Sequence, residues 1–237
     1  MKKIRLALLI VSGIVLLTSC RKVIGRGEHV TEQRATPNFT GVELGVPGDL
    51  YYTPSAQFKV EITAQQNVLD VIETDVSGGK LKIRVKHGVN LRKHESITVK
   101  ISAPDLRVLG VNGSGNLHAL LPFSPASLDV YINGSGKAEI GGVTTSRLDA
   151  KISGSGNIYV HDGDAEYEEL AISGSGDIDL AGVVADEVKT STSGSGNMRV
   201  HAVSKLDTKI SGSGSVYYKG NPVIKTNVSG SGRVIPI

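Results

Sequence analysis

Serine hydroxyl groups recur through the second half of the chain in seven copies of the tripeptide Gly-Ser-Gly. The first glycines are Gly113, Gly134, Gly154, Gly174, Gly194, Gly212 and Gly230, so the spacings are 21, 20, 20, 20, 18 and 18 residues. Hydroxyl and amide groups that repeat at such spacing could donate and accept hydrogen bonds along a carbohydrate. The tripeptide is no nucleophile elbow, because that turn requires Gly-x-Ser-x-Gly between a strand and a helix.

We predict that these serines, with the polar residues two positions after them, form an outward ladder that binds a ligand. The predicted members are Ser114, Ser135, Ser155, Ser175, Ser195, Ser213, Asn116, Asn157, Asp177 and Asn197. Another interpretation is structural: glycine permits a bend where no larger side chain fits, and serine satisfies backbone groups there. A break of the strand alternation at the glycines would instead turn the serines inward.

The residues around each tripeptide predict the elements that must position it. Apolar side chains dominate two positions before the first glycine, and again four and six positions after it, which is the period of two of a β-strand. The columns begin with Val111, Leu117 and Ala119 and recur in every copy. Repeats of about 20 residues with two or three short strands are typical of a parallel β-helix, whose coils stack roughly 4.8 Å apart. We therefore expect an all-β solenoid.

The segment before the repeats lacks Gly-Ser-Gly but alternates like strands. The expected strands cover residues 42–44, 50–52, 58–62, 81–85 and 97–101, and residues 67–73 suit a short helix. These strands could be further coils or a cap for the first coil. No linker-like stretch divides residues 30–237, so we expect one domain.

The first 20 residues read as a processing signal. Lys2, Lys3 and Arg5 precede an apolar run from Leu6 to Leu17, which is too short to span a bilayer, and the single cysteine, Cys20, follows that run. This stretch resembles the lipobox of bacterial lipoproteins. The resemblance implies a signal peptide at residues 1–19, lipid such as palmitate on Cys20, a tether over residues 20–29 and an outer-membrane location in the cell envelope. An ordinary secretory signal is the alternative.

Charge argues against nucleic acid as a partner. Without Lys2, Lys3 and Arg5, the 26 basic residues fall to 23 and equal the 23 acidic residues, so the mature chain is formally neutral and has no basic excess. We also predict no cofactor and no metal. His161 and His201 share a coil position but lie two coils apart, roughly 10 Å. Asp162, Asp164, Glu166, Glu168 and Glu169 are expected to be solvated surface charges, and no acid cluster indicates an enzyme.

Short motifs along the chain carry a resemblance to a known family. They are residues 39–42, 48–50, 60–62, 69–72, 79–83 and 103–106, followed by the Gly-Ser-Gly copies. In this order they resemble the putative auto-transporter adhesin, head GIN domain family. The resemblance implies a right-handed parallel β-helix and an adhesive function, with no catalytic motif to carry over.

The sequence thus predicts a lipid-anchored, non-catalytic envelope adhesin that binds surface glycans or other surface components. It would act as a monomer or weak homo-oligomer. Two alternatives remain: a structural envelope scaffold or assembly protein, and a β-helix polysaccharide lyase or hydrolase.

Overall fold

The computed structural model describes residues 21–237, which fold almost entirely as β-strands with one short helix. The predicted signal peptide, residues 1–19, and the predicted lipidation site, Cys20, lie outside the described residues. In the described part of the chain, no helix is both long enough and apolar enough to cross a membrane.

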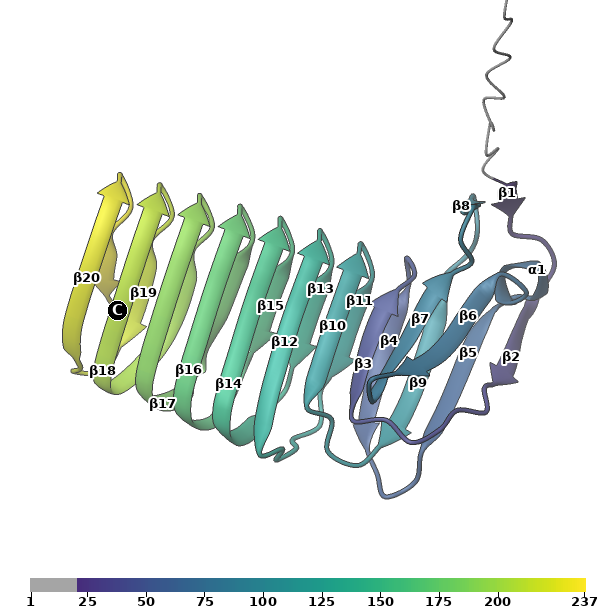
Figure 1. Cartoon of the computed structure of the whole chain (residues 1–237), viewed down its shortest axis with the longest axis horizontal. Helices are drawn as coiled ribbons and strands as arrows, with labels where there is room; N and C mark the ends of the chain where they lie inside the picture. Colours follow the sequence, from purple (N-terminus) through teal and green to yellow (C-terminus); the bar gives the residue numbers. More distant parts are fainter. Residues whose placement is uncertain (1–20) are drawn as a thin grey trace, which may run out of the picture.

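The Gly-Ser-Gly repeats form a parallel β-solenoid of about six turns, which confirms the predicted fold class (Figure 1). Each turn has a long strand that ends at the first glycine and a short strand that follows the tripeptide. The separate long strands are β10 (Val108–Gly113), β12 (Ser127–Gly134), β14 (Val143–Gly154), β16 (Gly163–Gly174) and β20 (Val223–Gly230). The separate short strands are β11 (Asn116–Ala119), β13 (Lys137–Ile140), β15 (Asn157–Val160), β19 (Val216–Lys219) and β21 (Val234–Pro236). In β17 (Asp177–Gly194) and β18 (Met198–Gly212) the short strand continues into the long one.

The change in spacing from 20 to 18 residues is absorbed at one corner of the solenoid. Most coils pair residue for residue, so Gly154 lies beside Gly174 and Gly174 beside Gly194. Between β17 and β18 the register shifts after Asp179 and again after Ala185. Because the register is regular from Glu187 onward, the rest of the long strand stays aligned, and Gly194 pairs with Gly212.

The apolar columns predicted from the repeats form the core. Ile132, Ile158, Ile178 and Val200 are at most 2% exposed, and their equivalents in neighbouring coils are buried with them. Complete burial of one such side chain contributes about 1.5–3 kcal/mol to stability. Stacking identical columns therefore stabilises each coil through its neighbours.

Both glycines of the tripeptide are required by close backbone contacts between coils. The first glycine has a positive φ, 131° at Gly154, and a Cβ there would collide with the carbonyl oxygen of Gly134. That carbonyl accepts hydrogen bonds from the amides of Ser155 (2.9 Å) and Gly156 (3.1 Å). A Cβ at Gly156 would collide with the carbonyl of Gly136. The expectation that no larger side chain fits is confirmed for both glycines of every copy from Gly134 onward.

The segment before the repeats supplies both coils and a cap. β3 (Gly41–Gly45) pairs in parallel with β10 on one side and with β7 (Lys80–Val85) on the other. β4 (Asp49–Pro54) pairs in the same way with β11 and with β9 (Thr98–Ala103). β2 (His29–Gln33), β5 (Lys59–Gln65) and β6 (Ile72–Ser77) add antiparallel strands beyond them. The five predicted strands are confirmed, and the antiparallel strands close this end of the solenoid.

The predicted helix is shorter than expected. α1 covers Gln66–Leu69 and buries Val68 and Leu69, whereas Ile72 and Glu73 already belong to β6. Ile72 is β-branched and pairs with Val85 of β7, and such a side chain fits the pleated surface of this antiparallel pair better than a helix.

Part of the predicted tether is held on the fold. β1 (Arg21–Ile24) pairs in parallel with β8 (Val89–Arg92) at the capped end. The side chain of Asn67 donates to the carbonyl of Ile24 (2.7 Å) and accepts from the amide of Arg26 (3.0 Å). The division of the chain at residue 30 stays a prediction.

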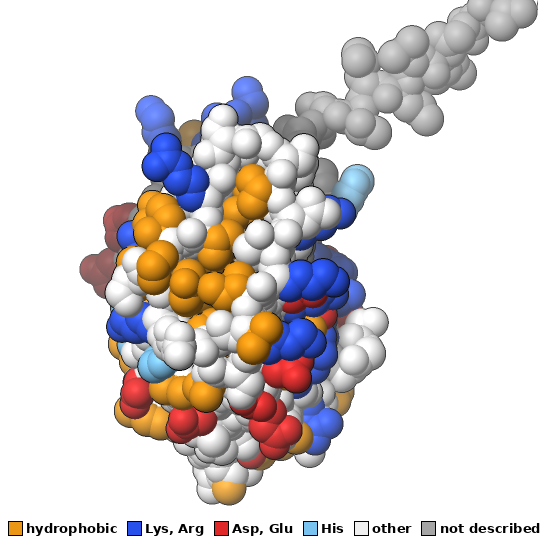
Figure 2. All heavy atoms as spheres, turned by 90° about the vertical axis from the view of Figure 1, so that its left-hand side faces the viewer, with side chains coloured by type: hydrophobic (Ala, Val, Ile, Leu, Met, Phe, Trp, Pro, Cys, Tyr) orange, Lys and Arg blue, Asp and Glu red, His pale blue; other side chains and the backbone are white. Residues whose placement is uncertain are grey.

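The opposite end carries β20. Ile224 and Val228 are 40% and 42% exposed there, although they continue core columns whose previous members, Leu206 and Ile210, are buried. Figure 2 looks onto this end and shows hydrophobic side chains gathered at its middle, with basic side chains beside them. In the described part of the chain, β18 is the strand that pairs with β20, so one edge of β20 faces solvent.

Candidate binding face

The short strands and the tripeptide turns that precede them carry three outward columns along the solenoid, and together we call these columns the short-strand face. Counted from the first glycine, the serine column lies at offset one, the amide column at offset three and the aromatic–charge column at offset five. The serine column contains Ser114, Ser135, Ser155, Ser175, Ser195, Ser213 and Ser231. β4 continues the second and third columns with Asp49 and Tyr51.

The serine column is exposed along its whole length. The second glycine of the tripeptide is buried in the six copies from Gly115 to Gly214, so the strand alternation continues through the turn. The backbone amides of the serines donate to glycine carbonyls of the preceding coil, as Ser175 does to Gly154 (2.9 Å). These amides therefore do not require the serine hydroxyls, which face solvent as the sequence predicted. Ligand binding by the column stays a prediction.

The amide column binds the coils to one another. Asn157 Oδ1 accepts from the backbone amide of Asp177 (3.1 Å), and Asp177 Oδ1 accepts from the backbone amide of Asn197 (2.8 Å). Asn197 Oδ1 accepts in turn from the amide of Ser215 (3.0 Å), and Asn116 Nδ2 donates to Asp49 Oδ1 (2.8 Å). These side chains are half-buried and fixed, so they offer a ligand a rigid set of polar atoms.

The aromatic–charge column was missed from the sequence. It contains Tyr51, His118, Glu139, Tyr159, Asp179, Arg199 and Tyr217, all partly or fully exposed. Tyr51 stacks on His118 with ring centroids 5.0 Å apart, and Arg199 lies over Tyr217 with Cζ 5.4 Å from the ring centroid. Lys137 of the amide column approaches the ring of Tyr159, 5.2 Å from its centroid. Writing the repeats out at offset five would have revealed this column.

Glu139 lies at the centre of a cluster of charged and histidine side chains on the short-strand face. Its carboxylate accepts from Lys137 Nζ (2.8 Å) and lies 3.0 Å from His161 Nε2 and 3.7 Å from His118 Nδ1. Hydrogen bonds from Lys137 and then His161 lower the pKa of Glu139, so the carboxylate stays charged at neutral pH. A carboxylate surrounded by basic groups cannot act as a general acid there.

A family model agrees with this architecture. The model described as putative auto-transporter adhesin, head GIN domain, matches residues 38–222. The chain belongs to this family. The matched region of this head GIN domain runs from just before β3 to just before β20 and so includes most of the short-strand face. An adhesin family is typical of cell-surface or envelope proteins and gives no indication of catalysis.

Solved structures show the same fold. A putative adhesin from Bacteroides fragilis is 24% identical with a TM-score of 0.86, covering 91% of this chain and 100% of that one. A putative lipid binding protein from Parabacteroides distasonis is 24% identical with a TM-score of 0.79, covering 92% and 100%. A putative adhesin from Parabacteroides merdae is 24% identical with a TM-score of 0.73, covering 92% and 99%. Among curated proteins, none is similar to this chain.

The two histidines singled out in the sequence have separate environments in this head GIN domain. His161 pairs with Glu139 on the short-strand face, whereas His201 lies two coils further along, beside Lys219 in the neighbouring strand. Over residues 21–237, no group of three or more His, Cys, Asp or Glu side chains is arranged to hold a metal ion.

One acidic residue was placed wrongly from the sequence. Glu168 was expected on the surface with Asp162, Asp164, Glu166 and Glu169, but it is 0% exposed. The reason is register: Glu168 pairs with Leu148 and Val188, so it occupies an inward column of the core. Neither carboxyl oxygen has a hydrogen-bond partner, and burial raises the pKa of Glu168 well above its ordinary value.

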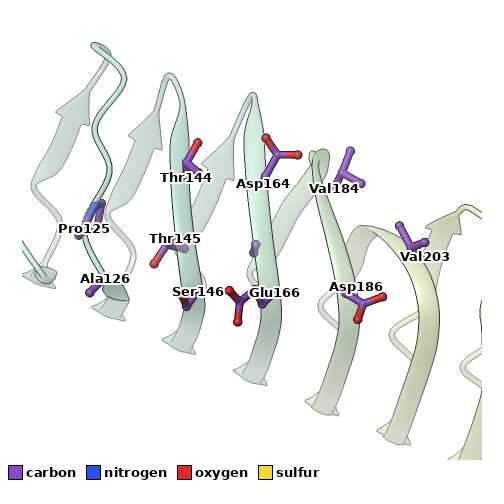
Figure 3. Close-up of a pocket in the computed structure, with 11 residues that line it drawn as sticks. Pro125, Ala126, Thr144, Thr145, Ser146, Asp164, Glu166, Val184, Asp186 and Val203 are labelled. Carbon is purple, nitrogen blue, oxygen red and sulfur yellow. Dashed lines mark hydrogen bonds between the residues drawn. The ribbon is translucent and has the colours of Figure 1, made fainter.

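A groove of about 520 Å³ crosses β14, β16 and β17 on another side of the head GIN domain (Figure 3). Thr144, Asp164 and Val184 line it at one level of the coils, and Ser146, Glu166 and Asp186 line it at a second level. Ser146 Oγ lies 3.3 Å from Glu166 Oε1, and Ser204 donates to Asp186. The groove lining contains neither a histidine nor a basic residue, and it was not predicted because it depends on how the corners of separate coils align.

Proposed function

We propose that this protein is a lipid-anchored, non-catalytic adhesin of the cell envelope, which binds surface glycans or other surface components through the short-strand face. The observation that carries the proposal is the continuous column of exposed serine hydroxyls beside partly exposed tyrosines. Membership of an adhesin family supports the adhesive role.

The chemistry of the face suits a repeating polymer such as a glycan chain. Tyrosine rings offer apolar contact area, while hydroxyl, amide and carboxylate groups fix orientation through hydrogen bonds. Because the coils repeat at roughly 4.8 Å, equivalent groups recur along the ligand and several weak contacts can act together. The amide column holds these groups rigid, which lowers the entropy cost of binding.

Lipid on Cys20 would hold the base of the solenoid at a membrane. Two or three acyl chains anchor a protein stably, whereas one chain binds marginally. In Figure 1 the first described strand, β1, lies at the opposite end from β20, so an anchor before Arg21 would leave the far coils extended from the membrane. Replacement of Cys20 by alanine is expected to abolish incorporation of labelled palmitate and to release the protein from the membrane fraction. Incorporation of labelled palmitate into the alanine variant would contradict the prediction that Cys20 carries the lipid.

The adhesive function is tested by binding of residues 21–237 to an array of glycans and host-matrix proteins. A variant with Ser155→Glu, Ser175→Glu and Ser195→Glu alters three successive members of the exposed column. The matched control has Ser124→Glu, Ser127→Glu and Ser191→Glu, three exposed serines outside the face. We expect saturable binding that the first variant loses and the control keeps, with unchanged unfolding curves for both. Equal binding by all three proteins would reject the short-strand face, and no binding by any would favour a scaffold.

A further inference from the structure

The capped end of the solenoid brings basic side chains together from two distant segments. Arg21, Lys22 and Arg26 come from the first described residues, and Lys86, Arg92 and Lys93 come from β8 and its flanks. All six are exposed. We call this group the basal cluster.

The β1–β8 ribbon fixes the position of the basal cluster. In this parallel pair Arg21 lies beside Val89, and Ile24 lies beside Arg92. A pocket of about 520 Å³ is lined by Arg21, Lys22, Arg26 and Lys86, with Asp70 as its one carboxylate. Lys22 also lines a second hollow with Arg92 and Lys93, so the basic side chains surround the ribbon.

Side chains of the domain fasten this segment to the cap. Asn67 holds both Ile24 and Arg26 through the two hydrogen bonds described above. Gln65 Nε2 donates to the carbonyl of Gly27 (3.2 Å), and Gln65 Oε1 accepts from the amide of Glu95 (3.3 Å). Lys86 Nζ donates to the backbone carbonyl of Asp70 (2.7 Å). The basal cluster is therefore part of the folded domain and not a loose tether.

The charges of the basal cluster are not neutralised within the part of the chain that the structure describes. None of its six side chains forms an ion pair there, whereas most basic residues of the central coils do, as Arg147 does with Asp149 and Glu169. The nearby carboxylate of Glu95 pairs with His29 instead. An exposed, unpaired basic cluster beside a half-exposed isoleucine, Ile24 at 47%, fits an anionic amphiphilic surface.

We propose that the basal cluster binds the anionic headgroups of a lipid surface and so orients the solenoid upright on its membrane. The inference rests on the proposed lipid anchor, because Cys20 directly precedes Arg21 and a lipid there would place the ribbon at the headgroups. Each basic side chain near an anionic surface strengthens binding by about fivefold at low ionic strength. This contact between the basal cluster and the headgroups adds to the binding of the acyl chains, and it sets the angle between the solenoid and the membrane.

The test uses residues 21–237, which contain the whole described core and carry no lipid, so it does not depend on Cys20. Sedimentation with phosphatidylcholine vesicles is compared with sedimentation with vesicles that also contain phosphatidylglycerol. We expect binding to the anionic vesicles only, and its loss in about 1 M NaCl, where charges are screened within roughly 3 Å. Equal binding to both vesicles, or none to either, would overturn the proposal.

Matched variants locate the contact. Lys22→Ala, Arg92→Ala and Lys93→Ala together are expected to lower partitioning into anionic vesicles about a hundredfold. The control, with Lys151→Ala, Lys209→Ala and Lys225→Ala, removes the same charge from exposed positions on the coils and should bind like the parent. Equal loss of partitioning in both variants would show that the vesicles attract the net charge of the protein and not the basal cluster in particular. Displacement by inorganic phosphate would indicate a site for a small anion. Either result would reject the proposal, while the glycan array remains a separate test of the short-strand face.

Discussion

At the scale of single residues, the first glycine of each repeat combines two constraints that substitution can separate. Gly113 and Gly174 both have a positive φ, of 115° and 132°. A Cβ at Gly174 would collide with the carbonyl of Gly154, whereas a Cβ at Gly113 meets no atom within 4 Å, because no earlier tripeptide lies beside it. The same substitution therefore tests backbone strain with and without a steric clash.

We predict that Gly113→Ala lowers the free energy of unfolding by about 1–2 kcal/mol through backbone strain. Gly174→Ala should cost a further 1–3 kcal/mol, roughly, because two coils must move apart. Urea unfolding of both variants measures the difference. Equal losses would mean that the close approach of the coils imposes no cost of its own.

Glu168 is a residue whose burial opposes stability. Burial raises its pKa well above that of a free glutamate, so the folded protein favours the protonated carboxyl. Stability is then fully present below the pKa of the unfolded chain, near 4.5, and falls as pH rises toward the folded pKa. The neutral acid is also unpartnered, which costs about 1–3 kcal/mol.

Replacement of Glu168 by leucine should therefore stabilise the protein, because Leu148 and Val188 occupy the same column. We expect a gain of about 2 kcal/mol at pH 5 and a larger gain at pH 8. Urea unfolding at the two pH values provides the measurement, and Glu166→Leu, on the exposed side of the same strand, is the control. A gain that does not change with pH would show that Glu168 does not remain protonated in the fold.

At the scale of elements, the amide column is expected to stabilise the stack of coils. Asn197 accepts from the amide of Ser215 and donates through Nδ2 to Asp177 (3.1 Å), so alanine at this position removes both hydrogen bonds. We predict that Asn197→Ala lowers the unfolding free energy by about 1–2 kcal/mol. Asn227→Ala, at an exposed position of β20, should change it by less than about 0.5 kcal/mol. Similar values for the two variants would contradict a structural role for the column.

The strands were predictable because their signal is local and repeated seven times. Ile158 and Ile178 appear in the sequence at the spacing that buries them in the structure, and the exposed Ser155 and Ser175 follow from the same alternation. Glu168 could have been placed by the same reasoning, because it lies 20 residues after Leu148 and 20 before Val188 in an inward column, but its acidic neighbours suggested a charged surface run.

Contacts between distant segments could not be predicted. The basal cluster depends on the pairing of β1 with β8, which brings Arg21 beside Val89, and no spacing in the sequence encodes that pairing. Tyr51 likewise reaches His118 only because β4 pairs with β11 as a coil that lacks Gly-Ser-Gly. The first of these surfaces lies in the cap and the second lies where the cap joins the repeats, so the spacing of the Gly-Ser-Gly copies does not predict them.

At the scale of the whole molecule, the fold should tolerate the loss of one coil but not a change in alternation. Deletion of residues 155–174 joins Gly154 to Ser175 and removes one complete repeat. Because β14 and β17 both pair with β16 in the same register, they can pair with each other after the deletion, and each inward column stays aligned. The removed coil includes Glu168, whose burial without a hydrogen-bond partner is unfavourable, so its removal offsets part of the stability lost with the packing of that coil.

Deletion of residues 155–173 provides the contrast, since it retains one residue more. That residue moves the following strands by one position relative to their neighbours, and a one-residue slip turns the apolar columns toward solvent. We expect the first deletion to unfold cooperatively with a slightly lower melting temperature, and the second to lose cooperative unfolding and expose apolar surface to a hydrophobic dye. If both deletions unfold alike, the stability of the rod does not depend on column alignment between coils. If only the first remains folded, the stack requires that the columns of neighbouring coils stay aligned through the tripeptide, and the one-sided columns of the short-strand face follow from the same requirement. The 21-residue spacing from Gly113 to Gly134 obeys it, because the extra residue lies between β11 and β12 and Gly113 still pairs with Gly134.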